Sequence, residues 1–130
     1  MASIKGGRTP LAYIVDDDEA VRDSTCVLLK SAGIAAVGFP SADAFLEVFD
    51  PDAAGCVLLD LHMPGMSGLE LLELMQSRGV KTPVIVISGR MDSLLNHLVR
   101  RAGAMAILSK PSSDDELLAL VQQAFSLQGK

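Results

Sequence analysis

Four apolar runs of the sequence are each followed by side chains that can take part in chemistry. In chain order these are the carboxylates of Asp16, Asp17 and Asp18, the carboxylate of Asp60, the hydroxyl of Ser88 and the amine of Lys110. Carboxylate oxygens suit Mg²⁺, Mn²⁺ or Ca²⁺ better than zinc. A carboxylate can also act as a nucleophile, while an ammonium group and a hydroxyl can hold phosphate oxygens. Brought together, these groups are suited to forming an aspartyl-phosphate.

Most of these residues also have an ordinary structural interpretation. Asp18 stands where an acid commonly caps a helix, Ser88 can belong to a simple turn, and Lys110 can be a solvated surface lysine. Asp60 is harder to explain in this way. It ends the apolar run Cys56–Leu59, which we expect to be buried, and a buried carboxylate needs partners. Several carboxylates at one point would repel one another, and a divalent cation would relieve that repulsion.

The elements that must position these residues alternate along the chain. Short apolar runs, several of them rich in Val or Ile, predict strands at Leu11–Val15, Ala35–Phe39, Cys56–Leu59, Val84–Ile87 and Met105–Leu108. An amphipathic helical pattern follows each of these runs, and glycines suited to a helix end follow three of the patterns, at Gly33, Gly79 and Gly103. Strands joined by helices are parallel, with right-handed crossovers, so the prediction is an open α/β sheet covered by helices on both faces.

This architecture would gather the reactive side chains at one place. Ligands of an open parallel sheet bind outside the carboxyl ends of its strands. Four of the five predicted strands end just before one of the groups named above. The sheet is therefore expected to bring together side chains that the sequence separates.

The composition limits the remaining possibilities. A chain of 130 residues with 49% apolar residues fits one domain with a core of its own. The net charge of −5 argues against direct binding of nucleic acid by this domain. No apolar run approaches the ~18 residues of a membrane span, and the basic start lacks the apolar segment of a signal peptide. Cys26 and Cys56 lie in apolar segments without metal-site spacing, which favours reduced, buried thiols in a cytoplasmic protein.

Four stretches resemble the marks of response-regulator receiver domains. They are Tyr13–Glu19, Leu58–Gly68, Val86–Gly89 and Leu108–Pro111, in the family's order and spacing. The residues of these stretches are most similar to those of receivers that precede helix-turn-helix output domains. The resemblance implies a flavodoxin-like, three-layer (βα)5 fold, with a five-stranded parallel sheet in the order 2-1-3-4-5. It also suggests a flexible extension at residues 1–10, a receiver domain at 11–126 and a tail at 127–130.

The same resemblance implies roles for individual residues. Asp60 would accept the phosphoryl group, and Lys110 would pair first with Asp60 and then with the phosphoryl group. Asp17 would bind Mg²⁺ directly, with Mn²⁺ as a possible substitute, and Asp16 would hold it largely through water. His62 would contribute its backbone carbonyl to the metal, without a required part for its imidazole. The domain would not be an enzyme in the usual sense, but would assist its own phosphorylation and dephosphorylation.

The resemblance further implies how the signal would arrive and leave. The donor would be the phosphohistidine of a sensor kinase or of a phosphotransfer protein. Ser88, followed by Gly89, would swing toward the phosphate, and the Lys110–Pro111 peptide would be cis. The surface formed by the fourth helix, the fifth strand and the fifth helix would then contact an output domain, a partner or a second copy of the chain.

The sequence departs from the family pattern at several positions. Ile107 stands where Tyr or Phe is usual, and Ser112 where Phe is frequent. Arg90 and Met91 place bulky side chains beside the site, where they either alter access and dephosphorylation or are surface variation. Ile107 and Ser112 leave open the alternative of a receiver-like interaction module that phosphate does not switch. A haloacid-dehalogenase-type phosphatase is disfavoured because the position that needs a second acid holds His62.

Overall fold

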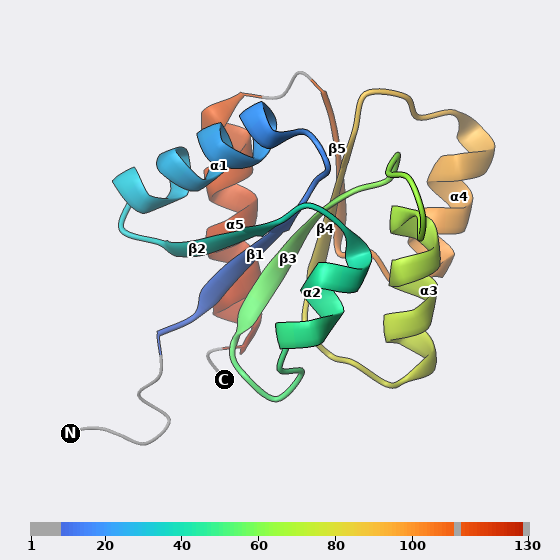
Figure 1. Ribbon diagram of the computed structural model, residues 1–130, viewed down its shortest axis with the longest axis horizontal. Coiled ribbons are helices and arrows are strands. Elements are labelled where there is room, and N and C mark those ends of the chain that lie inside the picture. The colour runs from blue at the N-terminus through green and yellow to red at the C-terminus, as the bar shows by residue number, and fades with distance from the viewer. Residues whose placement is uncertain (1–8, 111–112, 129–130) are drawn as a thin grey trace.

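The computed structural model describes residues 9–110 and 113–128, in which strands and helices alternate (Figure 1). The elements are β1 Leu11–Val15, α1 Glu19–Ser31, β2 Ala35–Phe39, α2 Ala42–Val48, β3 Gly55–Asp60, α3 Gly68–Ser77, β4 Val84–Ser88, α4 Ser93–Arg101, β5 Ala106–Ser109 and α5 Asp114–Gln128. All five predicted strands and all five predicted helices are present. Within the described residues, no helix has the length and apolar character needed to cross a lipid bilayer.

The five strands form one parallel sheet in the order β2-β1-β3-β4-β5. This confirms the predicted fold class and strand order. The chain adds β2 to one side of β1 and then crosses over to β3 on the other side. The order therefore reverses beside β1, and the carboxyl ends of β1 and β3 lie next to each other. In sheets of this kind, such a reversal is where a ligand site forms.

Alternate residues of the strands build two separate cores, one on each face of the sheet. On one face, Val57 and Leu59 of β3 belong to the core that α2, α3 and α4 cover. On the other face, Cys56 and Leu58 belong to the core under α1 and α5. Because β3 is buried on both faces, it reads as an unbroken apolar run that ends at Asp60.

Several element boundaries differ from the prediction. β3 runs from Gly55 to Asp60 and β4 runs to Ser88, so both strands include the polar residue expected to follow them. The hydrogen-bonded ladder causes this, since Asp60 pairs with Ile87 and Ser88 with Ser109 regardless of side-chain polarity. β5 is shifted by one residue relative to its predicted range. α5 continues to Gln128, two residues past the predicted boundary at 126.

The helix ends follow local rules of capping. Asp18 caps α1, accepting hydrogen bonds from the backbone N–H groups of Ala20 and Val21. α3 begins with a capping box between Ser67 and Glu70, which was not among the predicted features. Asp18 therefore has the structural role that was one of its two interpretations.

The two cysteines are free thiols. Cys56 is buried in β3, and burial raises the pKa of its thiol to about 12. Cys26 in α1 is only half-buried. The prediction of buried thiols therefore holds for Cys56 and only in part for Cys26.

Candidate functional site

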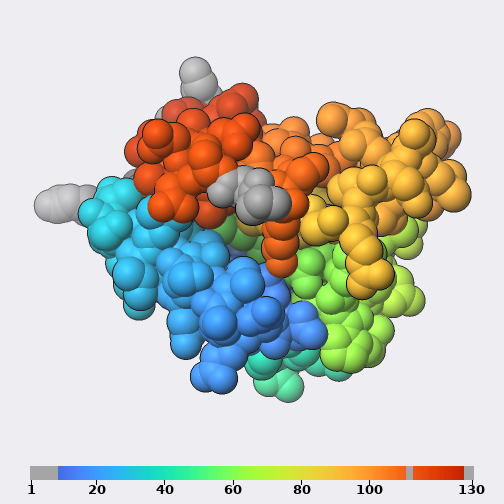
Figure 2. Space-filling view, turned by 90° about the horizontal axis from the view of Figure 1, so that it is seen from above, coloured from blue at the N-terminus to red at the C-terminus, as the bar shows by residue number. Residues whose placement is uncertain are grey.

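The carboxyl ends of the strands bring the predicted side chains to one edge of the molecule. Figure 2 looks onto this edge, where the β1–α1 segment in blue, the β3–α3 segment in green and the end of β5 in orange approach one another. Asp16 follows β1 directly, Asp60 ends β3 and Lys110 follows β5 directly. The prediction that the sheet gathers these three residues is confirmed by the contacts between their side chains.

Three carboxylates form a compact acidic cluster at this edge. Asp16, Asp17 and Asp60 each offer one oxygen, and these oxygens all lie within 4.8 Å of one another. Asp16 and Asp60 are buried, with 5% and 8% of their surface exposed, whereas Asp17 is exposed. An all-oxygen set with one face open to solvent fits Mg²⁺ or Mn²⁺, since Mg²⁺ keeps several of its waters. The donor atoms therefore suit the divalent cation that the sequence predicts.

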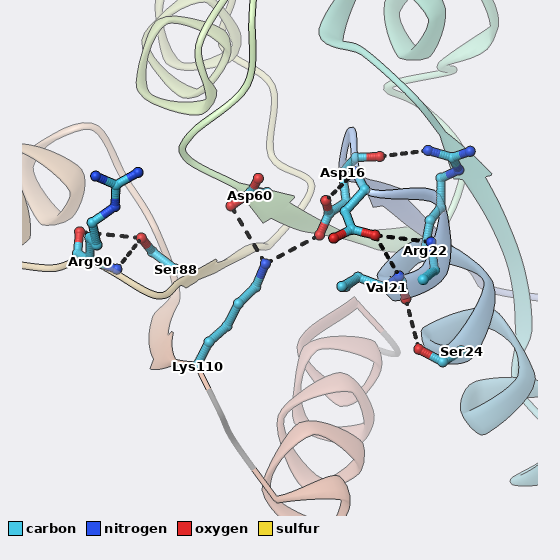
Figure 3. Close-up of polar contacts among 10 residues, drawn as sticks. Asp16, Val21, Arg22, Ser24, Asp60, Ser88, Arg90 and Lys110 are labelled. Carbon is cyan, nitrogen blue, oxygen red and sulfur yellow. Dashed lines mark hydrogen bonds and ion pairs between the residues drawn. The ribbon is translucent and has the colours of Figure 1, made fainter.

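Lys110 provides the positive charge that faces this cluster. Its Nζ atom lies 3.5 Å from Oδ2 of Asp16 and 3.8 Å from Oδ1 of Asp60. In Figure 3 the lysine side chain extends from the end of β5 and places its amine between the two carboxylates. The amine is thus within reach of any group attached to Asp60.

The surroundings of Asp60 disfavour its charged form. Burial raises the pKa of the Asp60 carboxyl above its ordinary value, and the negative charges of Asp16 and Asp17 raise it further. Lys110 and a backbone hydrogen bond from His62 act in the opposite direction. A divalent cation at the cluster would act in the same direction as Lys110 and His62. It would favour the ionised carboxylate, which is the nucleophilic form.

Every polar group of Asp16 has a partner. Its backbone N–H donates to the carbonyl of Phe39, and Oδ1 accepts a hydrogen bond from the N–H of Asp18 at 2.9 Å. Its carbonyl accepts a hydrogen bond from Nη1 of Arg22, also at 2.9 Å, and Oδ2 faces Lys110. Arg22 was not predicted as a site residue, because nothing in its spacing indicates that a helical arginine reaches back to the end of a strand.

Ser88 is fully buried, and its hydroxyl is held by the loop that follows β4. It donates a hydrogen bond to the carbonyl of Arg90 at 3.3 Å and accepts one from the Arg90 N–H at 3.2 Å. In Figure 3 these bonds point away from Asp60. To contact a phosphoryl group on Asp60, the hydroxyl would have to leave Arg90.

Gly89 lies against Lys110, since a Cβ at Gly89 would be 3.9 Å from the Lys110 Cβ.

The imidazole of His62 has a contact that the sequence did not predict. Its Nε2 atom lies 3.3 Å from the carbonyl oxygen of Arg90, which also accepts the Ser88 hydrogen bond. The loop after β3 is therefore tied to the loop after β4 through one carbonyl. The predicted role of the His62 carbonyl as a metal ligand stays a prediction.

Two further predictions concern β5 and the residues after it. Ile107, at the position that is usually aromatic, is half-buried and packs against the core under α2, α3 and α4. It pairs with Val86 of β4, so an aliphatic contact stands where a ring is common. The predicted cis peptide at Lys110–Pro111 and the substitution at Ser112 involve residues 111 and 112, which lie outside the described residues.

A cavity of about 600 Å³ opens next to the acidic cluster. Asp16, Asp60 and Lys110 line it together with apolar side chains of the sheet, α1 and α5, among them Val21 and Leu117. Two of the three carboxylates of the acidic cluster, Asp16 and Asp60, therefore border a cavity on the side of α1 and α5.

Comparisons with known proteins agree with this geometry. The family model for the response regulator receiver domain matches residues 12–122. The transcriptional regulatory protein FixJ of Bradyrhizobium diazoefficiens is 39% identical over 112 residues, which are 86% of this chain and 55% of that protein. The response regulator protein TodT of Pseudomonas putida is 37% identical over 120 residues, which are 92% of this chain and 53% of that protein.

Solved structures lead to the same family. The crystal structure of FixJ-N superposes with a TM-score of 0.82 at 36% sequence identity, covering 92% of this chain and 95% of that one. The response regulator StyR gives a TM-score of 0.86 at 37% identity, covering 92% of this chain and 61% of that one. The chain spans about half the length of the curated relatives it matches. By sequence and by fold, the chain belongs to the response regulator receiver domains, the phosphorylation-switched signalling domains of two-component systems.

Proposed function

We propose that Asp60 accepts the phosphoryl group and that Asp16 and Asp17 hold the divalent cation that this reaction needs. The observation that carries the proposal is the position of the Lys110 amine, 3.5 Å from Asp16 and 3.8 Å from Asp60. An amine at that place can follow the negative charge from the Asp60 carboxylate to the phosphoryl oxygens. The acidic cluster around the same carboxylate supports the metal assignment.

The proposed reaction is an in-line displacement at phosphorus. An oxygen of the Asp60 carboxylate attacks the phosphorus of a phosphohistidine, an O–P bond forms, and the P–N bond breaks. The imidazole leaves with the electron pair of that bond and takes up a proton from solvent. When bound, a divalent cation would neutralise negative charge on the transferred group. Lys110 contributes a second positive charge, and the chain itself only accepts and later loses the group.

We infer that the phosphoryl group then competes for the hydroxyl of Ser88. The hydroxyl now bonds to the backbone of Arg90. A phosphate brings charge and strong acceptor oxygens, so it can draw this hydroxyl away and change the loop before α4. The surface of α4, β5 and α5 follows that loop and is the proposed contact for an output domain or a second copy. The proposed place of action is the cytoplasm, where sensor kinases present their phosphohistidine.

The direct test is the intact mass of the chain after incubation with acetyl phosphate and Mg²⁺. We expect a labile gain of one phosphoryl group, which disappears when the cation is chelated. Asp60→Asn should abolish the gain, whereas Asp43→Asn, at an exposed position in α2, should keep it. A sizing column run on the same samples reports whether phosphorylation changes the oligomeric state. No gain in the wild-type chain would instead favour the interaction module that phosphate does not switch.

A further inference from the structure

Arg22 crosses β2 to reach the edge that carries the acidic cluster. Its Nη1 atom donates a hydrogen bond of 2.9 Å to the backbone carbonyl of Asp16 (Figure 3). On its way the side chain lies directly on Gly38 of β2. A Cβ added to Gly38 would lie 2.6 Å from Cγ and 2.9 Å from Cδ of Arg22, closer than real Cβ contacts. The path of the arginine therefore depends on the absence of a side chain at residue 38.

The carbonyl that Arg22 binds belongs to the turn between β1 and α1. The β1–β2 ladder ends with the pair Val15 and Phe39, after which the Asp16 N–H still donates to Phe39. Among the residues that the structure describes, no strand residue donates a hydrogen bond to the Asp16 carbonyl. Arg22, which lies one turn into α1, donates a hydrogen bond back to this carbonyl. Residues 16–22 therefore form a closed loop. That closed segment carries Asp17.

We propose that Arg22 is a positioning residue for the divalent-cation site, and that it can take this position because Gly38 has no side chain in its path. This inference rests on the proposed function, since it concerns the site at Asp16, Asp17 and Asp60. Arg22 does not touch the cation. It fixes the backbone of Asp16, and thereby the direction in which the carboxylates of Asp16 and Asp17 point.

Charge and geometry predict opposite effects when Arg22 is removed. If the arginine acted only as a nearby positive charge, it would repel a divalent cation, and its loss would tighten binding. If it acts by holding the turn, its loss weakens binding. Groups that orient metal ligands in this way typically contribute about 10–100-fold in metal affinity. The sign of the change therefore separates the two explanations.

Gly38→Ala offers an independent test because it leaves the charge of Arg22 in place. The atoms that the new Cβ would meet belong to the flexible stem of one side chain, with no backbone atom among them. The stem can move aside without a shift of β2, so the variant is expected to fold. What it loses is the hydrogen bond to Asp16.

The experiment is calorimetric titration of the full chain with Mg²⁺ alone, for the wild type, Arg22→Ala, Gly38→Ala and the double variant. We expect each single variant to weaken binding about tenfold. The double variant should be no weaker than Arg22→Ala, because the two changes break the same contact. Arg22→Lys keeps the charge on a shorter stem and should fall between the wild type and Arg22→Ala. Arg78→Ala, at the end of α3, controls for loss of an arginine charge elsewhere.

A second readout uses the chain without any metal. The Asp18 N–H bonds to Oδ1 of Asp16, so its hydrogen exchange should become faster in both single variants. Unchanged or tighter Mg²⁺ binding by Arg22→Ala, wild-type binding by Gly38→Ala, or losses that add in the double variant would each overturn the inference. If the wild type itself fails to bind Mg²⁺, the proposed function and this inference fall together.

Discussion

Asp60 is a buried carboxyl group beside two other acids, and this placement has a measurable effect on stability. Its pKa is raised in the folded chain, chiefly by burial, so the folded state holds the Asp60 proton more tightly than the unfolded state does. The contribution of Asp60 to the free energy of unfolding is then highest below the unfolded-state pKa of about 3.9, and it falls as the pH rises from there through the folded-state value.

Asp60→Asn removes this dependence. Without divalent cations, we expect the variant to have a larger free energy of unfolding than the wild type at neutral pH. The difference should shrink as the pH falls below the unfolded-state pKa, where Asp60 is protonated in both states. Urea unfolding at several pH values measures it, with Asp43→Asn as the control. A variant less stable than the wild type at neutral pH would contradict the prediction.

Arg90 is the residue whose effect on the phosphorylated state we expect to be kinetic. Its backbone holds Ser88 and His62, while its exposed side chain follows Gly89 beside the site. We expect that side chain to restrict the approach of water to a phosphoryl group on Asp60. Arg90→Ala should therefore shorten the lifetime of the aspartyl-phosphate severalfold, as followed by intact mass over time. An unchanged lifetime, equal to that of Arg78→Ala, would mean that Arg90 is surface variation.

Some site residues could be predicted from the sequence and others could not, for a physical reason. Asp16, Asp60 and Lys110 lie at strand ends, and a parallel sheet places such ends together whatever the details of packing. The contacts of Arg22 and of the His62 imidazole depend on the direction of a long or ring side chain, whereas His62 was predicted only for its backbone carbonyl. The sequence contains no periodic signal for such directions. The only sequence feature connected with the Arg22 contact is the glycine at residue 38, and by itself it resembles any other glycine in a strand.

At the scale of elements, the start of α3 fits tightly under the end of β3. Gly68, the first residue of α3, donates its N–H to the carbonyl of Leu61. A Cβ at Gly68 would lie 2.3 Å from the carbonyl oxygen of Asp60 and 2.7 Å from the Cα of Leu61. Both are backbone atoms, so there is no flexible side chain that can move aside. The position of α3 and the backbone of the phosphorylation site are therefore coupled.

Gly68→Ala should disturb stability and phosphorylation together. We expect a loss of about 1–3 kcal/mol in the free energy of unfolding, as for overpacking in a close-packed region, and slower labelling of Asp60 by acetyl phosphate. Glu73→Ala is the control, because Glu73 is an exposed residue of α3 away from the site. Urea unfolding and intact mass provide the two measurements. Equal behaviour of the two variants would show that α3 does not constrain Asp60.

The element boundaries show where prediction from residue type stops. Apolar runs located all five strands. The predicted β3 and β4 stopped one residue too early, because Asp60 and Ser88 are polar, yet both residues belong to their strands. Both residues are bonded into the ladder, and Asp60 also faces the site. A strand that ends in a functional residue has no boundary signal in its side chains. The capping box of α3 is different, because Ser67 and Glu70 carry a recognisable pattern that identifies the helix start.

For the whole molecule, cation binding and folding stability should be linked. A ligand that binds only the folded chain stabilises it by about 2.7 kcal/mol at a concentration one hundred times its Kd. We expect Mg²⁺ at that ratio to raise the free energy of unfolding by this amount in the wild type. Asp17→Asn should lose most of the effect, because Asp17 is one of the proposed metal ligands. Asp17 is exposed, so the substitution leaves the core intact. Equal stabilisation of both proteins would mean that Mg²⁺ acts elsewhere on the chain.

Four of the five aromatic side chains are gathered on one face of the sheet. Tyr13 contacts Phe39, Phe45 and Phe49, with ring centroids 5.3 to 6.2 Å apart, on the side covered by α2. It is the single tyrosine of a sequence without tryptophan. The near-ultraviolet circular dichroism of the chain therefore arises mainly from this one packed phenol. A variant that keeps this spectrum while losing cation affinity retains its native packing on this face of the sheet, so the single tyrosine provides a spectroscopic control for the substitutions described above.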